Sequence, residues 1–173
     1  MVILKNNQVK RKIIAIIMAW LLFIGVDFLF HASILEAFWK EDLAALKSLE
    51  DLALLIPTGY VSFLLLTILI FYVYDKIFTS KPKFKVSVSF GIVFGLLFSL
   101  SNLLGLYSYI SLPIKNLILF NLVYFIEIVV VVMTIHHVLF SEKRKKVVWM
   151  GILYFFLLVV LGIVIQNIMN NMI

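Results

Sequence analysis

The chain contains no cysteine among its 173 residues, and charged side chains make up only 14% of it. The lack of cysteine excludes disulfides, thiolate nucleophiles, iron–sulfur clusters and cysteine-based zinc sites. A typical soluble domain carries about 25% charged residues, whereas this chain is 64% hydrophobic with a mean hydropathy of +1.15. The composition therefore excludes a soluble globular class and indicates an integral membrane protein.

Catalytic motifs are also missing. The sequence has no glycine-rich phosphate loop, no H-E-x-x-H pair and no G-x-S-x-G nucleophile elbow. We therefore expect a protein that is not an enzyme and that needs no cofactor.

Long apolar runs fill almost the whole chain. A helix needs about 20 apolar residues to cross the hydrocarbon core of a bilayer. Five stretches meet this requirement: residues 13–35, 54–74, 86–109, 117–140 and 147–169. We predict a single domain over residues 1–173, folded as an all-α, five-helix transmembrane bundle.

Basic residues lie in three clusters that alternate along the chain. The clusters are Lys5–Lys12, Lys76–Lys85 and Lys143–Lys146, whereas the other connections carry only Lys40, Lys47 and Lys115. Under the positive-inside rule, this places the N-terminus in the cytoplasm and the C-terminus outside a cell membrane. Because the charges abut apolar runs, their expected partners are anionic lipid headgroups on the cytoplasmic side, and not nucleic acid.

The first outer connection, Glu36–Asp51, has apolar residues recurring among acidic ones. Phe38, Leu43, Leu46 and Leu49 follow spacings of five and three residues. This pattern predicts a short amphipathic helix lying on the outer surface between spans one and two.

Small residues recur every four positions along the third span, at Ser87, Gly91, Gly95 and Ser99. Such a stripe lets two helix backbones approach closely, which drives helix association in lipid. The stripe predicts a tight helix contact, either with another span or with a second copy of the protein.

Ionisable residues inside spans are expensive and mark functional sites. Asp27 and His31 are four residues apart, so they share one helix face, and Glu127 lies on the fourth span. At 1.5 Å per residue, Asp27 lies roughly 21 Å from the inner side and Glu127 roughly 16 Å. His136 and His137 lie at the inner end of the fourth span, where we expect them to anchor at the headgroups.

If spans one and four pack together, Asp27, His31 and Glu127 meet in one polar pocket open to the outer side. Asn102, Asn121 and Tyr124 join them as candidate ligand- or proton-binding residues. Three interpretations stay open. Burial could keep Glu127 neutral as a proton-exchange site; the three ionisable residues could hold a divalent metal; or an Asp27–His31 pair and a hydrogen-bonded Glu127 could be purely structural.

The run Asp27-Phe28-Leu29-Phe30-His31, followed by an aromatic and acidic outer segment, resembles small uncharacterised prokaryotic multi-pass membrane proteins. This resemblance covers about the first third of the chain and implies a compact helical bundle. Five spans are also typical of the tryptophan-rich sensory family, but its Trp-Pro motifs are missing, since Trp20, Trp39 and Trp149 do not adjoin a proline.

These observations predict a protein that binds or translocates a small solute or ion through an outward-facing polar pocket. The alternative is a non-catalytic scaffold or accessory subunit that packs on a membrane partner, or on its own copy, through the small-residue stripe.

Overall fold

A computed structural model describes residues 2–36 and 49–172. Within these ranges every element of secondary structure is helical: α1 (Val2–Leu29), a π-helical turn η1 (Phe30–Ile34), α3 (Leu49–Ile77), α4 (Phe84–Tyr109), α5 (Ile114–Phe140) and α6 (Arg144–Met172). Five helices are long and apolar enough to cross a membrane, over Gln8–Ile34, Leu54–Ile77, Phe84–Tyr109, Ile114–Phe140 and Arg144–Asn171. Each expected span is found, with ends that differ from the prediction by a few residues.

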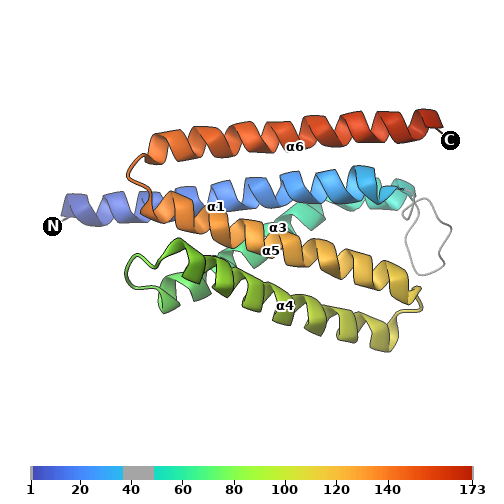
Figure 1. Cartoon of the computed structure of the whole chain (residues 1–173), viewed down its shortest axis with the longest axis horizontal. Helices are drawn as coiled ribbons and strands as arrows, with labels where there is room; N and C mark the ends of the chain where they lie inside the picture. Colours follow the sequence, from blue (N-terminus) through green and yellow to red (C-terminus); the bar gives the residue numbers. More distant parts are fainter. Residues whose placement is uncertain (1, 37–48, 173) are drawn as a thin grey trace.

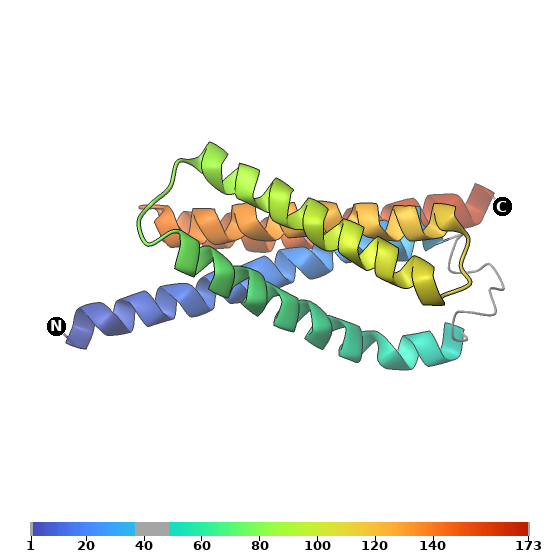
Figure 2. The same ribbon diagram turned by 90° about the horizontal axis from the view of Figure 1, so that it is seen from below.

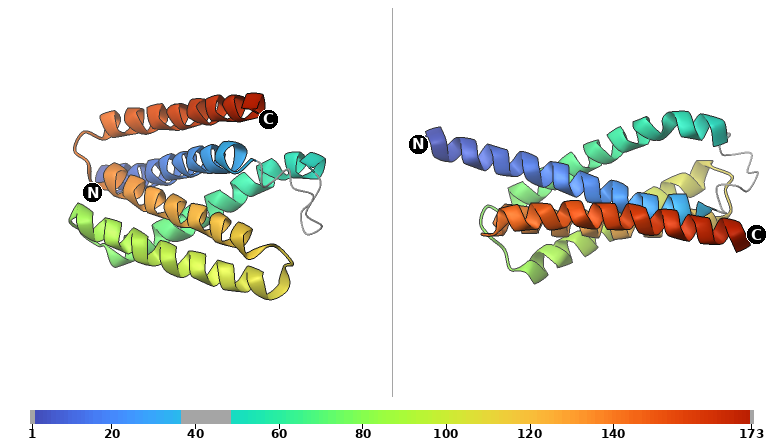
Figure 3. Two further views of the ribbon diagram at one scale, coloured as in Figure 1. Left: turned by 45° about the vertical axis from the view of Figure 1, so that its right-hand side comes forward. Right: turned by 90° about the horizontal axis from the view of Figure 1, so that it is seen from above.

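Helix α5 lies at the centre of the bundle. Its buried positions run from Asn116 to Leu139, and it packs most extensively against α4 and α1. Helix α6 packs mainly on the opposite side of α1, so that α6, α1, α5 and α4 follow one another across the molecule (Figures 1 and 3). Helix α3 packs on α1 and α5, and it crosses α1 obliquely (Figure 2). It diverges from α4 away from their shared connection (Figure 1).

The three basic clusters lie at one end of the bundle. The N-terminus and the α3–α4 and α5–α6 connections share this end, whereas the α4–α5 connection and the C-terminus lie at the other (Figure 1). Polar contacts tie the basic end together. Lys12 Nζ lies 2.6 Å from an Asp75 carboxylate oxygen, and the Arg11 guanidinium donates to the carbonyls of Val138 at 3.2 Å and Ser141 at 2.9 Å.

The small-residue stripe of Ser87, Gly91, Gly95 and Ser99 is buried, as expected, and it faces α5 of the same chain. A Cβ atom on Gly91 would lie 3.2 Å from Val132 Cβ, and one on Gly95 would lie 3.1 Å from Phe125 Cδ2. The choice that the sequence left open is therefore settled: the partner of the stripe is another span.

The outer surface of the bundle is strongly apolar. Along α6, Trp149 is 71% exposed, Leu153 63% and Phe156 59%. Aliphatic and aromatic side chains at this exposure are stable where lipid, and not water, surrounds them.

The expected outer amphipathic helix over Glu36–Asp51 lies almost entirely outside the described residues. Its last three residues, Leu49–Asp51, form the first turn of α3.

Candidate functional site

The packing of α1 against α5 brings Asp27, His31 and Glu127 together. One ligand atom from each residue lies within 4.8 Å of the other two. Asp27 and His31 are one turn apart near the end of α1, and His31 Nε2 lies 3.8 Å from Asp27 Oδ1. Glu127 lies midway along α5. The convergence that the sequence made conditional on contact between spans one and four is thus present.

A π-helical turn gives α1 an irregular end at this site. Residues Phe30–Ile34 form η1, which contains His31. Such turns interrupt regular α-helices and occur often at functional sites. The Ser33 hydroxyl donates to the Leu29 carbonyl within the turn, and the His31 ring lies against Phe120 of α5 with centroids 5.7 Å apart.

Glu127 is the most deeply buried of the three residues. It is only 1% exposed, whereas the side chains of His31 and Asp27 are 18% and 20% exposed. Its Oε1 atom has no hydrogen-bond partner among the described residues. The purely structural interpretation requires a hydrogen bond to Glu127, and Oε1 makes none to the part of the chain that the structure describes.

The other three candidate residues lie nearby but form a separate group. Asn102 Nδ2 donates to Asn121 Oδ1 at 2.9 Å, and Asn121 Nδ2 donates to the Leu117 carbonyl at 2.8 Å. Asn102 and Tyr124 line a groove of about 400 Å³ between α3, α4 and α5. Tyr124 lies three residues before Glu127 on α5, so the two residues share one side of that helix. The three residues of the ionisable cluster do not line this groove.

The cluster offers two carboxylates and an imidazole, a donor set that suits divalent metals such as zinc or manganese. The same groups can exchange protons or hydrogen-bond a small polar solute. No Lys or Arg occurs within residues 13–35 or 117–140 to neutralise the carboxylates.

A second polar cluster, which the sequence did not predict, joins three helices nearer the basic end. Ser87 Oγ lies 2.7 Å from the Tyr74 hydroxyl and 2.8 Å from His136 Nδ1, and the Tyr74 hydroxyl lies 3.1 Å from the same nitrogen. The expectation that His136 anchors at the headgroups is wrong, because this residue is only 5% exposed. His137, the adjacent residue, is exposed.

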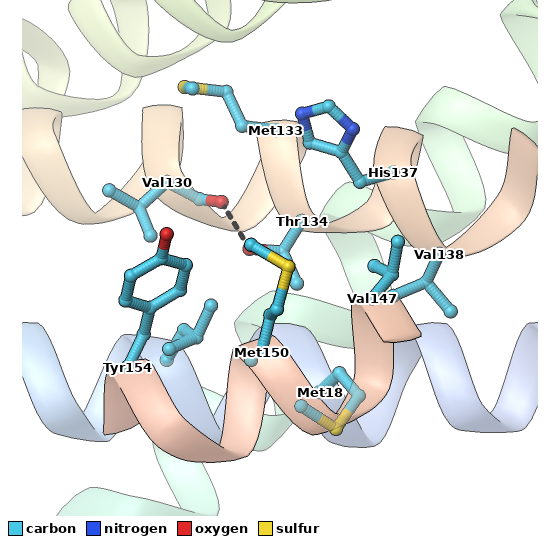
Figure 4. A pocket seen from close by; sticks show the side chains of 11 residues that line it. Met18, Val130, Met133, Thr134, His137, Val138, Val147, Met150 and Tyr154 are labelled. Carbon is cyan, nitrogen blue, oxygen red and sulfur yellow. Dashed lines mark hydrogen bonds between the residues drawn. The ribbon is translucent and has the colours of Figure 1, made fainter. Parts of the chain in front are cut away.

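An apolar groove of about 370 Å³ lies between α1, α5 and α6. Figure 4 shows Met18, Met150 and Tyr154 around it, with Thr134 turned back so that its hydroxyl donates to the Val130 carbonyl at 2.8 Å. The groove contains neither carboxylate of the ionisable cluster.

No protein-family model, curated protein or solved structure matches the chain. The five helices are long and apolar enough to cross a membrane, which is compatible with a multi-pass membrane protein.

Proposed function

We propose that this is a cell-membrane protein that binds or translocates a small solute or ion at the Asp27–His31–Glu127 cluster. The observation that carries the proposal is the convergence of three ionisable side chains from α1 and α5 within 4.8 Å. Such groups are rare inside membranes and mark substrate or ion pathways. Asp27 and Glu127 bind the solute or ion, and each carboxyl group releases its proton to solvent when it binds an ion and takes one up when the ion leaves.

The groove between α3, α4 and α5 supplies an approach to the cluster. Asn102 and Tyr124 line it, and Tyr124 lies three residues from Glu127 on α5. With the N-terminus in the cytoplasm, as the basic clusters predict, Asp27 and His31 lie towards the outer side. The solute or ion therefore enters from outside.

The alternative, a scaffold or accessory subunit docking through the small-residue stripe, needs a different surface. Val132 and Phe125 of α5 already cover Gly91 and Gly95. We therefore favour the binding or transport function.

The test measures proton flux in liposomes that contain the purified protein and a pH-sensitive dye. We expect Glu127→Gln to keep the shape of the side chain and the fold but to abolish protein-dependent dissipation of an imposed pH gradient. The matched control is Glu142→Gln, which removes an exposed carboxylate from the α5–α6 connection and should leave the flux unchanged. A correctly folded Glu127→Gln protein with wild-type flux would remove Glu127 from the mechanism.

A further inference from the structure

We propose that the Asp27–His31–Glu127 cluster binds one divalent transition-metal ion, of the class that includes Mn²⁺, Fe²⁺ and Zn²⁺. This inference rests on the proposed function, because it names the ion that the same site takes.

Charge balance selects a divalent ion. Two ionised carboxylates and a neutral imidazole carry a charge of −2, which a divalent ion neutralises completely and a monovalent ion does not. Net charge in a low-dielectric interior is severely penalised. Residues 13–35 and 117–140 contain no Lys or Arg that could supply the missing positive charge.

Ligand chemistry selects a transition metal. Ca²⁺ and Mg²⁺ prefer sites made of oxygen ligands, whereas imidazole nitrogen suits zinc, iron and related ions. His31 Nε2 lies 3.8 Å from Asp27 Oδ1 and adds a nitrogen ligand to the two carboxylates. This ligand favours transition metals over Ca²⁺ and Mg²⁺.

The geometry is close to that of a bound metal. Ligand atoms at about 2.0–2.2 Å from a tetrahedral ion are separated from one another by about 3.3–3.6 Å. The three ligand atoms lie within 4.8 Å of one another, so small side-chain rotations close the site. Three protein ligands leave one coordination position open, which allows the ion to exchange.

An independent observation at Glu127 also points to a ligand. The side chain is 1% exposed, and its Oε1 atom has no hydrogen-bond partner among the described residues. A buried polar atom without a hydrogen-bond partner is costly. Coordination of a metal ion by Oε1 would remove this cost, and Oε1 would lose no hydrogen bond in binding the ion.

The experiment titrates the full chain in detergent micelles with Mn²⁺ and follows the free-ion signal by electron paramagnetic resonance. We expect one Mn²⁺ to bind per chain, excess Mg²⁺ to leave it bound, and stoichiometric Zn²⁺ to displace it. Asp27→Asn, His31→Gln and Glu127→Gln should each weaken binding by at least about tenfold, because each removes a direct ligand. Glu142→Gln serves as the matched control and should bind as the wild type does.

Each outcome is decisive for the proposal. Wild-type protein that binds no Mn²⁺ at millimolar concentration, or that loses its Mn²⁺ equally to Mg²⁺, overturns the metal assignment even if a variant fails to fold. Loss of proton flux in Glu127→Gln without any metal binding removes the metal and leaves the proposed function standing. Metal binding by a wild-type protein whose flux does not depend on Glu127 removes the proposed function and leaves a structural metal site.

Discussion

At the scale of single residues, the buried polar groups are satisfied very unequally. Tyr74, Ser87 and His136 lie within 3.1 Å of one another through their polar atoms. Glu127 Oε1 has no hydrogen-bond partner among the described residues, and neither has the side-chain amide of Asn116. Because an unsatisfied buried group costs about 1–3 kcal/mol, we expect the first cluster to stabilise the bundle and the unpaired Oε1 atom of Glu127 to lower its stability.

This difference predicts opposite effects of two substitutions on the unfolding free energy in detergent. Tyr74→Phe removes only the hydroxyl and keeps the ring packed on Phe78 and Phe90. It should destabilise the protein by about 0.5–1.5 kcal/mol for each hydrogen bond lost, and the hydroxyl lies within hydrogen-bond distance of both Ser87 and His136.

Glu127→Leu, by contrast, should leave the stability unchanged or raise it, because the carboxyl is replaced by an apolar side chain. Denaturant unfolding followed by tryptophan fluorescence measures both changes. A Glu127→Leu protein less stable than Tyr74→Phe would show that Glu127 has a structural partner.

Some features of the site can be predicted from the sequence alone, whereas others depend on how the helices pack. Asp27 and His31 share a helix face because of their four-residue spacing, which any helix imposes. Their meeting with Glu127 depends on which spans pack together, and helix periodicity carries no such information. The expectation that His136 lies at the headgroups is wrong because a histidine near a helix end has the same sequence pattern in both environments. Its partners Tyr74 and Ser87 come from two other helices, so the sequence around His136 does not reveal them.

At the scale of elements, the contact between α4 and α5 depends on the absence of side chains. A Cβ on Gly95 would lie 3.1 Å from Phe125 Cδ2 and 3.3 Å from the Phe125 carbonyl oxygen. The carbonyl belongs to the backbone and cannot rotate away, so even a Cβ atom requires its neighbours to give by a few tenths of an ångström. A side chain as large as leucine must separate the helices.

We therefore expect Gly95→Leu to destabilise the protein by at least about 1–3 kcal/mol, the range for overpacked interiors. Gly105→Leu is the matched control, because it lies on the same helix and a Cβ there would meet nothing within 4 Å. Thermal unfolding in detergent compares the two variants. Equal stability of both proteins would contradict the close α4–α5 contact.

The regular spacing of the stripe made it predictable, but glycines elsewhere serve the same purpose without a regular pattern. A Cβ on Gly151 would lie 2.5 Å from Met18 Cε, and one on Gly162 would lie 2.9 Å from Phe28. These two glycines of α6 let it approach α1 closely. They are eleven positions apart, so neither repeats at the four-residue interval that marks a stripe, and the α1–α6 contact could not be predicted from sequence. The π-helical turn η1 was also not predicted, because it depends on how the end of α1 packs against its neighbours.

At the scale of the whole molecule, the alternation of charge along the chain becomes a separation of charge in space. The N-terminus and the two basic connections lie at one end of the bundle (Figure 1). One positive charge there, Lys12, is paired with Asp75, and most of the cluster residues have no acidic counterpart nearby in sequence. This end is therefore strongly basic, as the cytoplasmic side of a membrane protein is.

The charge separation predicts the orientation, which reporter fusions can measure. A reporter that is active only in the cytoplasm should work at Lys12 and near Lys81, and one that is active only outside should work after Asn171. Replacing Lys143, Arg144, Lys145 and Lys146 by glutamine should weaken the preference of the α5–α6 connection for the cytoplasmic side. Positive charges next to a span keep the adjoining connection from crossing the membrane. The matched control is Lys115→Gln, which removes a positive charge from the opposite end of the bundle and should leave the orientation unchanged. A wild-type C-terminus found in the cytoplasm would overturn the five-span orientation, and with it the inference that ions reach Asp27 and His31 from outside.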